Sequence, residues 1–539
     1  MSTLKYLRPD IAFEPLICRW YAWSLLVAPA TLAMTARNRL LPLMASFIED
    51  PDFHRESVRD PALRGGSFVD FDGDLAIARD FDARLQRDLA PLLALADALV
   101  EANELLLREG SGGSLEPLYE RLPALLRGCV ELGYDLNNHP SLRLIEPLLY
   151  ASGLYDPALQ SVLLRPLGDA ERPFMLVTPV IDAPAGVLLD VPFADGIHDE
   201  LARMREHGLG PADFDALCSR LGAHGAAASA VQSLFTETPP AGRASPVPAG
   251  RVRVRYLGHA AMLVEADGVA ILVDPSLAYD TGAGMARYTF ADLPTTIDYV
   301  LITHNHQDHV NFETLLQLRY KIGTIVVPRC NGGTVQDPSL RLVLETIGFR
   351  SVIELDELQV LKLPGGHVTG VPFLGEHCDL HIRTKLGYQL ELQGQRLMFL
   401  ADSNNLDTAL YERLARLLPS PDVVFIGMEC TGGPMSWLYG DLLPRRLRRE
   451  HDQARRLNGS DFERGRRIID LFEPRAVLVY AMCAEPWFSH LTSAIYTAAS
   501  VPMIESDKLV EHCRRRGMLS ERLYGTRDIV LENGTVALG

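Results

Sequence analysis

Closely spaced cysteines are missing from this 539-residue sequence. It contains no C-x-x-C pair, and its eight cysteines are scattered singly along the chain, at Cys18, Cys129, Cys218, Cys330, Cys378, Cys430, Cys483 and Cys513. Scattered cysteines are typical of a reducing compartment, where disulfides do not persist. We therefore expect a cytoplasmic protein without a disulfide framework.

Long apolar runs are also missing. The most apolar N-terminal stretch, residues 20–30, is shorter than the ~20 residues that span a bilayer, and Pro29 interrupts it. Glu14, Pro15 and Arg19 interrupt the approach to this stretch, which is unlike the start of a signal peptide. The sequence predicts a buried helix there and no association with a membrane.

Positive charge is in deficit. The chain has 52 Lys and Arg against 69 Asp and Glu, a net charge of −17. A general nucleic-acid binder gains its affinity by neutralising phosphates, so this balance argues against a nucleic-acid partner. One run, Arg445-Arg446-Leu447-Arg448-Arg449, opposes the trend; such runs are usually solvated helix faces.

The length exceeds that of one ordinary domain, and 47% hydrophobic with 22% charged residues is typical of a globular protein. Residues 236–250 are rich in Pro, Gly, Ser and Thr and lack periodicity, as in a semi-rigid linker. This composition predicts an N-terminal domain over 1–235, a linker over 236–250 and a second domain over 251–539.

The N-terminal domain contains no motif with evident chemistry. Apolar residues at helical spacing predict helices over 81–109, 115–132 and 212–221, and short apolar runs predict strands over 174–179 and 186–190. This pattern predicts a mixed α/β domain. We expect it to serve as a docking surface or as the interface of a homodimer.

Three histidines and one aspartate fall within six positions of the second domain. The apolar, β-branched run 300–302 predicts a buried strand, and His304, His306, Asp308 and His309 follow it directly. Imidazole and carboxylate are ligands of transition metals, and a spacing of two lets an extended segment point both first rings the same way. Asp308 and His309 follow a turn and can reach a second ion. The sequence therefore predicts a dinuclear metal site, in preference to a loop of solvated histidines.

The pattern His304-x-His306-x-Asp308-His309 resembles that of the metallo-β-lactamase fold superfamily. Residues 251–260 and 269–275 resemble the opening strands of this fold, including the Asp274-Pro275 pair that ends the second strand. The resemblance implies an αββα sandwich for the second domain. It also implies that Asp274 lies behind the metal and orients a histidine, although an aspartate at a strand end can equally cap a turn.

Two later segments complete the expected site. The strand 395–401 ends at Asp402, which matches the family position whose carboxylate bridges both metals. Glu376 lies where hydrolases of this fold supply a histidine, and His367 competes with it for that role; we favour Glu376, because its match covers several neighbours. Hydrolases of this fold usually have another histidine near the end of a late strand. Residues 475–483 occupy that position and contain no histidine, so the second metal ion is expected to keep open coordination positions.

The ligand set indicates the metal. Three carboxylates, Asp308, Glu376 and Asp402, leave two divalent ions a formal charge near +1. Zinc needs a positive site to acidify its bound water, whereas a pair of oxygen-activating irons must tolerate Fe(III), which carboxylates and open positions favour. The departure from the hydrolase pattern therefore points to iron.

Glu376, the missing late histidine and the segment Pro15–Trp23 together resemble the dinuclear-iron β-hydroxylases typified by the enzyme of chloramphenicol biosynthesis. The resemblance spans most of the chain. It implies a monooxygenase that uses O2 and an external electron donor to hydroxylate an aminoacyl group on a carrier domain of a nonribosomal peptide synthetase.

The same resemblance implies roles for single residues. His304, His306 and Glu376 are expected to hold one iron, Asp308 and His309 the other, with Asp402 between them, and Glu376 and Asp402 are the expected catalytic groups. On this hypothesis the arginine run at 445–449 steers an acidic carrier domain to the site.

Two other functions are compatible with the metal motif. A zinc or manganese hydrolase could cut an ester, lactone or phosphodiester with metal-bound hydroxide. A carrier-binding scaffold with a structural metal is the weakest alternative, because structural sites are closed and mononuclear as a rule. Near the site, His377 and His381 are interpreted as packing or orienting residues, and Glu429 with residues 434–440 as a wall of the substrate pocket.

Overall fold

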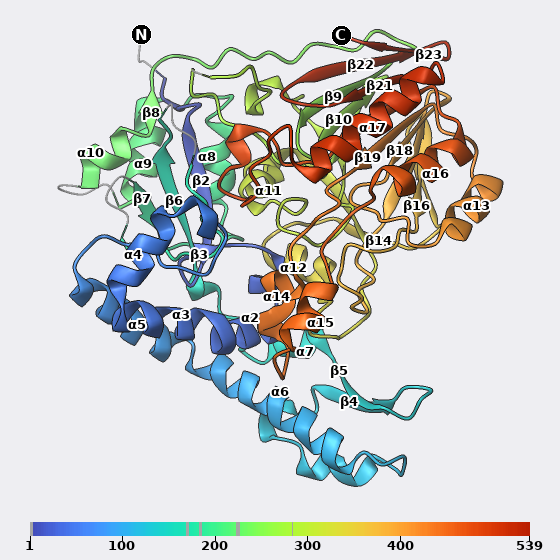
Figure 1. The fold of residues 1–539 in the computed structure, drawn as a ribbon. Coiled ribbons are helices and arrows are strands. Elements are labelled where there is room, and N and C mark those ends of the chain that lie inside the picture. Colours follow the sequence, from blue (N-terminus) through green and yellow to red (C-terminus); the bar gives the residue numbers. More distant parts are fainter. Residues whose placement is uncertain (1–3, 169–171, 183–185, 223–226, 283) are drawn as a thin grey trace.

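Two facing β-sheets form the C-terminal half of the chain (Figure 1). The computed structural model describes residues 4–168, 172–182, 186–222, 227–282 and 284–539. The first sheet has the strand order β14-β13-β12-β11-β10-β9-β22-β23. Its strands are β9 (Val252–Gly258), β10 (Ala261–Ala266), β11 (Val269–Val273), β12 (Ile297–Leu301), β13 (Ile322–Pro328), β14 (Val352–Leu355), β22 (Arg527–Glu532) and β23 (Thr535–Leu538).

The second sheet has the order β15-β16-β17-β18-β19-β20-β21. Its strands are β15 (Val360–Leu363), β16 (Gly366–Val371), β17 (Gly387–Leu392), β18 (Gln395–Phe399), β19 (Val423–Gly427), β20 (Ala476–Tyr480) and β21 (Leu519–Arg522). The end of the chain returns to the first sheet, where β22 pairs antiparallel with β9.

Apolar side chains from both sheets fill the space between them. Tyr256 of the first sheet and Phe399 and Phe425 of the second are fully buried, and the two phenylalanine rings stack with centroids 4.7 Å apart. Helices α11 (Phe312–Leu318) and α12 (Leu340–Thr346) lie beside the first sheet. Helices α13 (Thr408–Leu417), α16 (Phe462–Phe472) and α17 (Val501–Arg515) cover the second. The predicted αββα sandwich is confirmed.

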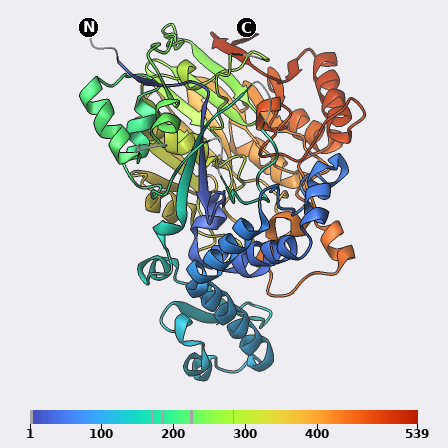
Figure 2. The same cartoon turned by 90° about the vertical axis from the view of Figure 1, so that its left-hand side faces the viewer.

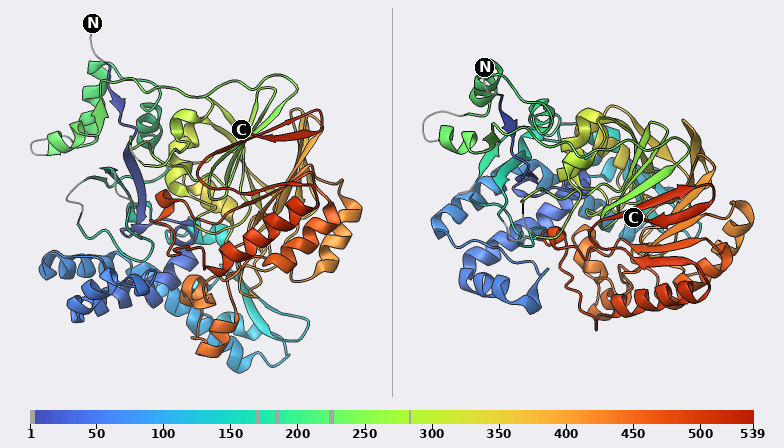
Figure 3. Two further views of the ribbon diagram at one scale, coloured as in Figure 1. Left: turned by 45° about the horizontal axis from the view of Figure 1, so that its top comes forward. Right: turned by 90° about the horizontal axis from the view of Figure 1, so that it is seen from above.

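The N-terminal half is built on a four-stranded antiparallel sheet of order β3-β2-β6-β7, set to one side of the sandwich (Figure 3). These strands are β2 (Ile11–Ile17), β3 (Trp20–Tyr21), β6 (Gln160–Pro166) and β7 (Val187–Leu189). The main helices are α2 (Pro29–Thr35), α3 (Leu41–Glu49), α5 (Leu75–Asp88), α6 (Ala90–Glu109), α8 (Ile197–Arg203) and α9 (Pro211–Arg220). Helix α6 and the hairpin of β4 (Val130–Tyr134) and β5 (Pro140–Leu144) extend away from the body (Figure 2).

Proline explains where the expected helices differ from the observed ones. The single helix predicted over 81–109 is two, because α5 ends at Asp88 and Pro91 opens α6. The helix predicted over 115–132 is wrong, since Pro117 and Pro123 limit this stretch to short 3-10 turns before β4.

Two other expected elements also differ. The strand predicted over 174–179 is not formed, because its backbone does not enter a strand ladder: Met175 N–H donates to His490 O, and Val177 O accepts from the side-chain indole of Trp20. Residues 20–30 are buried as predicted, but form β3, the short helix α1 (Ser24–Val27) and the start of α2. No helix in the described ranges is both long and apolar enough to cross a bilayer.

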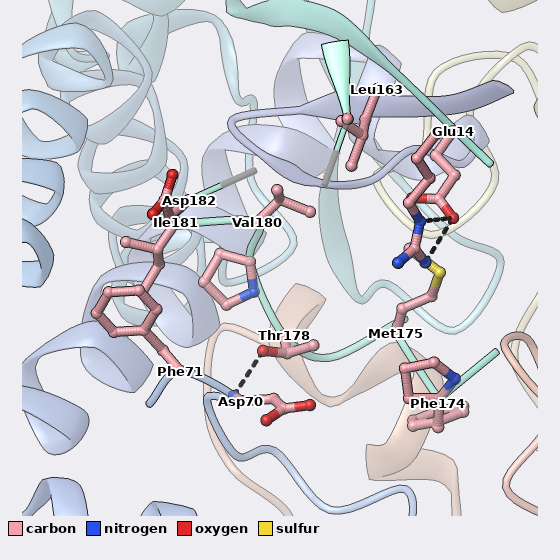
Figure 4. A pocket seen from close by; sticks show the side chains of 14 residues that line it. Glu14, Asp70, Phe71, Leu163, Phe174, Met175, Thr178, Val180, Ile181 and Asp182 are labelled. Atoms are coloured by element: carbon pink, nitrogen blue, oxygen red, sulfur yellow. Dashed lines mark hydrogen bonds and ion pairs between the residues drawn. The ribbon is translucent and has the colours of Figure 1, made fainter. Parts of the chain in front are cut away.

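A buried ionic network joins the two halves. Arg172, 9% exposed, lies between Glu14 of β2 and Glu313 of α11, at 3.1 and 3.0 Å. The Tyr21 hydroxyl donates to Glu313 at 2.6 Å. A cavity of about 230 Å³ adjoins Glu14 and Arg165 in the N-terminal half (Figure 4). Because one core also runs from the N-terminal helices to α11 and α12, the two halves pack as one body.

Candidate metal centre

Three loops bring all six predicted ligand side chains to one edge of the sandwich. His304, His306, Asp308 and His309 follow β12, Asp402 follows β18, and Glu376 lies between β16 and β17. β16 and β18 both run antiparallel to β17, so their carboxyl ends lie at the same edge of the second sheet. The Leu386 N–H donates to Thr303 O at 2.7 Å, which joins the end of β12 in the first sheet to this edge.

The first group of ligand atoms is His304, His306 and Glu376. One ligand atom from each lies within 4.8 Å of the others, and all three side chains are buried. Glu376 Oε1 lies 2.8 Å from His306 Nδ1, and Glu376 Oε2 lies 3.7 Å from His304 Nε2. Two imidazoles and one carboxylate therefore face a common point.

The second group lies beside the first and shares His304. Asp402 Oδ2 is 3.2 Å from His309 Nε2 and 3.9 Å from His304 Nε2. Asp308 Oδ2 is 3.9 Å from the same nitrogen of His309. Asp402 thus faces both His309 and His304, and His304 also belongs to the first group.

Several of these ligand atoms lack hydrogen bonds. Within the described ranges no group donates to or accepts from His304 Nε2, Glu376 Oε2 or Asp402 Oδ1, although all three atoms are buried. Buried polar atoms are normally hydrogen-bonded, because an unpaired one loses its hydrogen bonds to water and gains none in the protein. Divalent cations shared by these atoms would satisfy them, so the residues fit a dinuclear metal centre.

Burial sets the protonation of the first group. It lowers the pKa of His304 well below its ordinary value, so this imidazole is neutral and its Nε2 lone pair is available. Burial also raises the pKa of Glu376 to about 7, against the opposing effect of His306. A bound cation would favour the carboxylate form, which is the form that binds metal.

Residues behind the ligands orient them. Asp274 Oδ2 lies 2.8 Å from His309 Nδ1, and Asp274 also accepts from the backbone N–H and hydroxyl of Thr303, at 2.7 and 2.6 Å. This contact places the proton of His309 on Nδ1 and leaves Nε2 for a metal. The role predicted for Asp274 is therefore confirmed.

Tyr439 has the same relation to His306. Its hydroxyl lies 2.9 Å from His306 Nε2 while Nδ1 faces Glu376. The partners are 133 positions apart in the sequence, so no local pattern predicts this contact. Only the predicted grouping of 434–440 near the site anticipated it.

The backbone around the centre is strained. Glu376 follows Gly375 in a left-handed turn, with φ of 64° and 79°. A side chain at position 375 would collide with Asn404, so glycine is required there. Left-handed φ recurs at other non-glycine residues near the centre: His259, Asp274, Cys378, Asp379, Ala401, Ala481 and Cys483. Such strain clusters at functional sites, where the surrounding structure enforces it.

His367 and His381 lie apart from the ligand groups, whereas His377 contacts the first group: its Nδ1 lies 3.1 Å from Glu376 Oε2. His367 is inside β16, where it pairs with Lys362 and Glu391, and belongs to no group of ligand atoms within the described ranges. His381 is exposed. His377 is buried and stacks on His306, with ring centroids 4.6 Å apart, so it packs against a ligand as expected.

Glu429 and the loop 434–440 border the centre. Glu429 accepts hydrogen bonds from the Tyr496 hydroxyl and from the backbone of Thr431 and Gly432. The Trp437 indole donates to Gly65 O of the N-terminal half at 3.2 Å. The loop therefore connects the N-terminal half to the metal centre through Tyr439.

His259 and Cys483 were not predicted as site residues. With Asp308 they form a third group of possible ligand atoms, and Cys483 occupies the late strand end where hydrolases of this fold have a histidine. The Cys483 backbone N–H donates to His259 Nδ1 at 3.1 Å. A neutral imidazole that accepts at Nδ1 carries its proton on Nε2, and this nitrogen lies 3.3 Å from Asp308 Oδ2. His259 Nε2–H therefore faces Asp308 Oδ2 without the geometry of a hydrogen bond, and a nitrogen that carries a proton has no lone pair for a metal.

Substitution of His259 separates these two roles. Glutamine can reproduce both contacts, since its carbonyl accepts and its amide donates, whereas leucine reproduces neither. We expect His259→Gln to keep the metal content of the wild type. We expect His259→Leu to lower the affinity for one metal ion by about 10- to 100-fold. Metal content after dialysis measures this affinity. Equal loss of metal in both variants would show that His259 itself is a metal ligand.

Comparison with known proteins gives matches along the whole chain. Residues 6–239 match the family described as "Diiron non-heme beta-hydroxylase N-terminal domain", and residues 253–434 match "Beta-lactamase superfamily domain". The chain is 40% identical over 536 residues to the 4-amino-L-phenylalanyl-[CmlP-peptidyl-carrier-protein] 3-hydroxylase of Streptomyces venezuelae, covering 97% of this chain and 99% of that protein.

A solved structure agrees. The crystal structure of CmlA, a diiron β-hydroxylase from Streptomyces venezuelae, superimposes with a TM-score of 0.90 at 38% identity, covering 98% of this chain and all of that one. A UPF0173 metal-dependent hydrolase of Methanopyrus kandleri is 27% identical over 190 residues, which are 34% of this chain and 75% of that protein. The hydrolase likeness is thus partial, whereas the hydroxylase likeness spans both halves.

Proposed function

This chain belongs to the diiron non-heme β-hydroxylases, and from that premise we propose that it hydroxylates the β-carbon of an aminoacyl group held as a thioester on a carrier domain of a nonribosomal peptide synthetase. Membership makes the chain an enzyme of the monooxygenase type. The family name implies two iron ions. The substrate, the O2 requirement and the single residue roles are the proposal.

The observation that supports this proposal best is the buried carboxylate of Glu376 between His304 and His306. A hydrolase of this fold has an imidazole there. A carboxylate in its place lowers the positive charge of the centre and favours the higher oxidation state of iron. Zinc chemistry, which acidifies water, gains from the opposite change.

In this proposal His304, His306 and Glu376 would hold one iron and Asp308 and His309 the other, with Asp402 between them. When bound, the iron pair would supply the redox chemistry that side chains alone lack. The chain fixes the ligands: Asp274 sets the tautomer of His309. Burial of His304 and His309, each with no exposed surface, keeps bulk water from that side.

The reaction consumes one O2, two electrons and two protons for each C–H bond converted to C–OH, and releases one water. In this proposal the electrons come from an external donor. We propose the N-terminal domain, residues 1–235, as the docking or homodimer surface, joined by the linker 236–250 to the metal domain 251–539. A cytoplasmic location accords with eight cysteines that are all free thiols.

Metal analysis and a mass measurement test this function. We expect two irons per chain, with the optical absorption of an oxo-bridged ferric pair. After anaerobic reduction and addition of O2, a panel of aminoacyl carrier domains, including one loaded with 4-amino-L-phenylalanine, is read by intact-protein mass. A gain of one oxygen atom on a loaded carrier supports the proposal. Two zinc ions with esterase activity and no gain of mass would contradict it.

A further inference from the structure

One segment connects the protein surface to two of the proposed iron ligands. We call residues 434–456 the cover segment; it comprises α14 (Met435–Tyr439), the turn η8 (Gly440–Leu442) and α15 (Arg449–Ala454). On its inner side the Tyr439 hydroxyl meets His306 Nε2 at 2.9 Å. Arg455 Nε donates to Cys378 O at 2.7 Å, two residues beyond Glu376.

The outer side of the cover segment is basic. Arg445, Arg446, Arg448 and Arg449 are all exposed. None of the four forms an ion pair with another side chain in the described part of the chain, whereas exposed arginines elsewhere, such as Arg121 and Arg515, pair with glutamates. Four unpaired guanidinium groups within five residues repel one another, so this arrangement gains most from an external anion.

The rest of the protein disfavours an anionic partner. With a net charge of −17, the chain as a whole repels negative charge. A carrier domain that presents a phosphopantetheine arm brings a phosphodiester at the base of the arm. Arginine recognises phosphate with paired, charge-assisted hydrogen bonds. Charge complementarity therefore restricts such a partner to the basic side of the cover segment.

The geometry also suits the arm. Arg445, at the surface, is six positions after Tyr439, which contacts the ligand His306, so their Cα atoms are at most about 21 Å apart. An extended phosphopantetheine chain can bridge that length. A phosphodiester held by the arginines would thus leave the thioester within reach of the metal centre.

From these contacts we infer that Arg445, Arg446, Arg448 and Arg449 form the docking surface for the carrier domain, with the phosphodiester of its arm as the recognised group. This inference rests on the proposed function, since it assumes a carrier-bound substrate. It goes beyond that function in assigning the partner's position on the enzyme.

The experiment compares two fourfold variants of the full chain. The test variant is Arg445→Glu, Arg446→Glu, Arg448→Glu and Arg449→Glu. The control reverses four other exposed arginines that form no ion pair among the described residues: Arg350, Arg413, Arg416 and Arg467. Both variants change the net charge equally, and iron content with the optical spectrum verifies the metal centre in each.

The probe is the peptidyl carrier domain of the Streptomyces venezuelae relative's partner, in its phosphopantetheinylated form, with binding followed by fluorescence anisotropy. We expect the Kd of the test variant for the carrier to be about 10-fold higher or more, and that of the control to stay within 2-fold of the wild type. Added salt should weaken carrier binding by the wild type far more than carrier binding by the test variant. Phosphopantetheinylated carrier should also bind the wild type more tightly than its apo form.

The outcomes separate the two proposals. If the wild type loads iron and binds or hydroxylates the carrier, and the test variant does so equally well, the docking surface is wrong and the function stands. If the wild type neither binds this carrier nor oxidises any loaded carrier, the proposed function fails and the docking surface fails with it. Loss in the test and control variants alike would show a general charge effect and would also overturn the inference.

Discussion

Asp402→Asn is expected to yield a folded protein that holds fewer than two metal ions and hydroxylates at least about 100-fold more slowly than the wild type, since loss of a residue that merely orients a ligand already costs about 10- to 100-fold. Asp402 lies between the two ligand groups, 3.2 Å from His309 Nε2 and 3.9 Å from His304 Nε2. Asparagine keeps the shape of the side chain but removes the charge that two neighbouring cations need.

Measured metal stoichiometry and single-turnover hydroxylation test this expectation. Asp407→Asn is the matched control, because Asp407 is exposed and caps α13 by accepting from Ala409 N–H, a role that asparagine also fills. The control should retain both metal ions and full turnover. An Asp402→Asn protein with two irons and normal turnover would show that this carboxylate does not bridge the centre.

Glu376→Gln is expected to have the second large effect. The amide retains the volume of the carboxylate in a buried site, but provides one neutral oxygen where two charged oxygens now face His304 and His306. The centre becomes more positive, and Fe(III) becomes harder to reach. We expect hydroxylation to fall by more than about 100-fold even where iron remains bound.

Glu376→His adds a test of the metal preference. Histidine restores the ligand usual in hydrolases of this fold, so we expect this variant to retain zinc in preference to iron and to lose oxygen-dependent turnover. Asp379→Asn is the control in the same loop, because Asp379 is exposed and its left-handed backbone suits asparagine. Competition between zinc and iron, followed by metal analysis, gives the readout; hydroxylation by the zinc-preferring variant at the wild-type rate would contradict the role of Glu376.

The pKa of Glu376 adds a condition to these measurements. Burial raises this pKa to about 7 in the metal-free protein, so below pH 7 the group is mostly protonated and a metal must displace its proton. Metal loading is therefore best carried out above pH 7, and comparisons between variants need a fixed pH.

Much of the fold could be predicted from the sequence. Apolar composition predicts the strand before His304 and the strand before Asp402, and the candidate ligands come shortly after each strand. Composition and periodicity failed to predict the structure where it depends on which strands pair with one another. Residues 174–179 have the composition of a strand, yet their backbone bonds to the His490 carbonyl and to the Trp20 indole instead of forming a strand ladder.

From the sequence, residue type at short spacing indicated His304, His306, Asp308 and His309 as candidate ligands, and the resemblance to known families added Glu376, Asp402 and the αββα sandwich. Only the tertiary structure decided what lies behind those ligands. His259 reaches Asp308, Tyr439 reaches His306, and the arginines of the cover segment lie on the outer side of the same segment. Such contacts join residues far apart in the chain, and hydrogen bonds of this kind follow from how the strands and loops are packed, which no local pattern records.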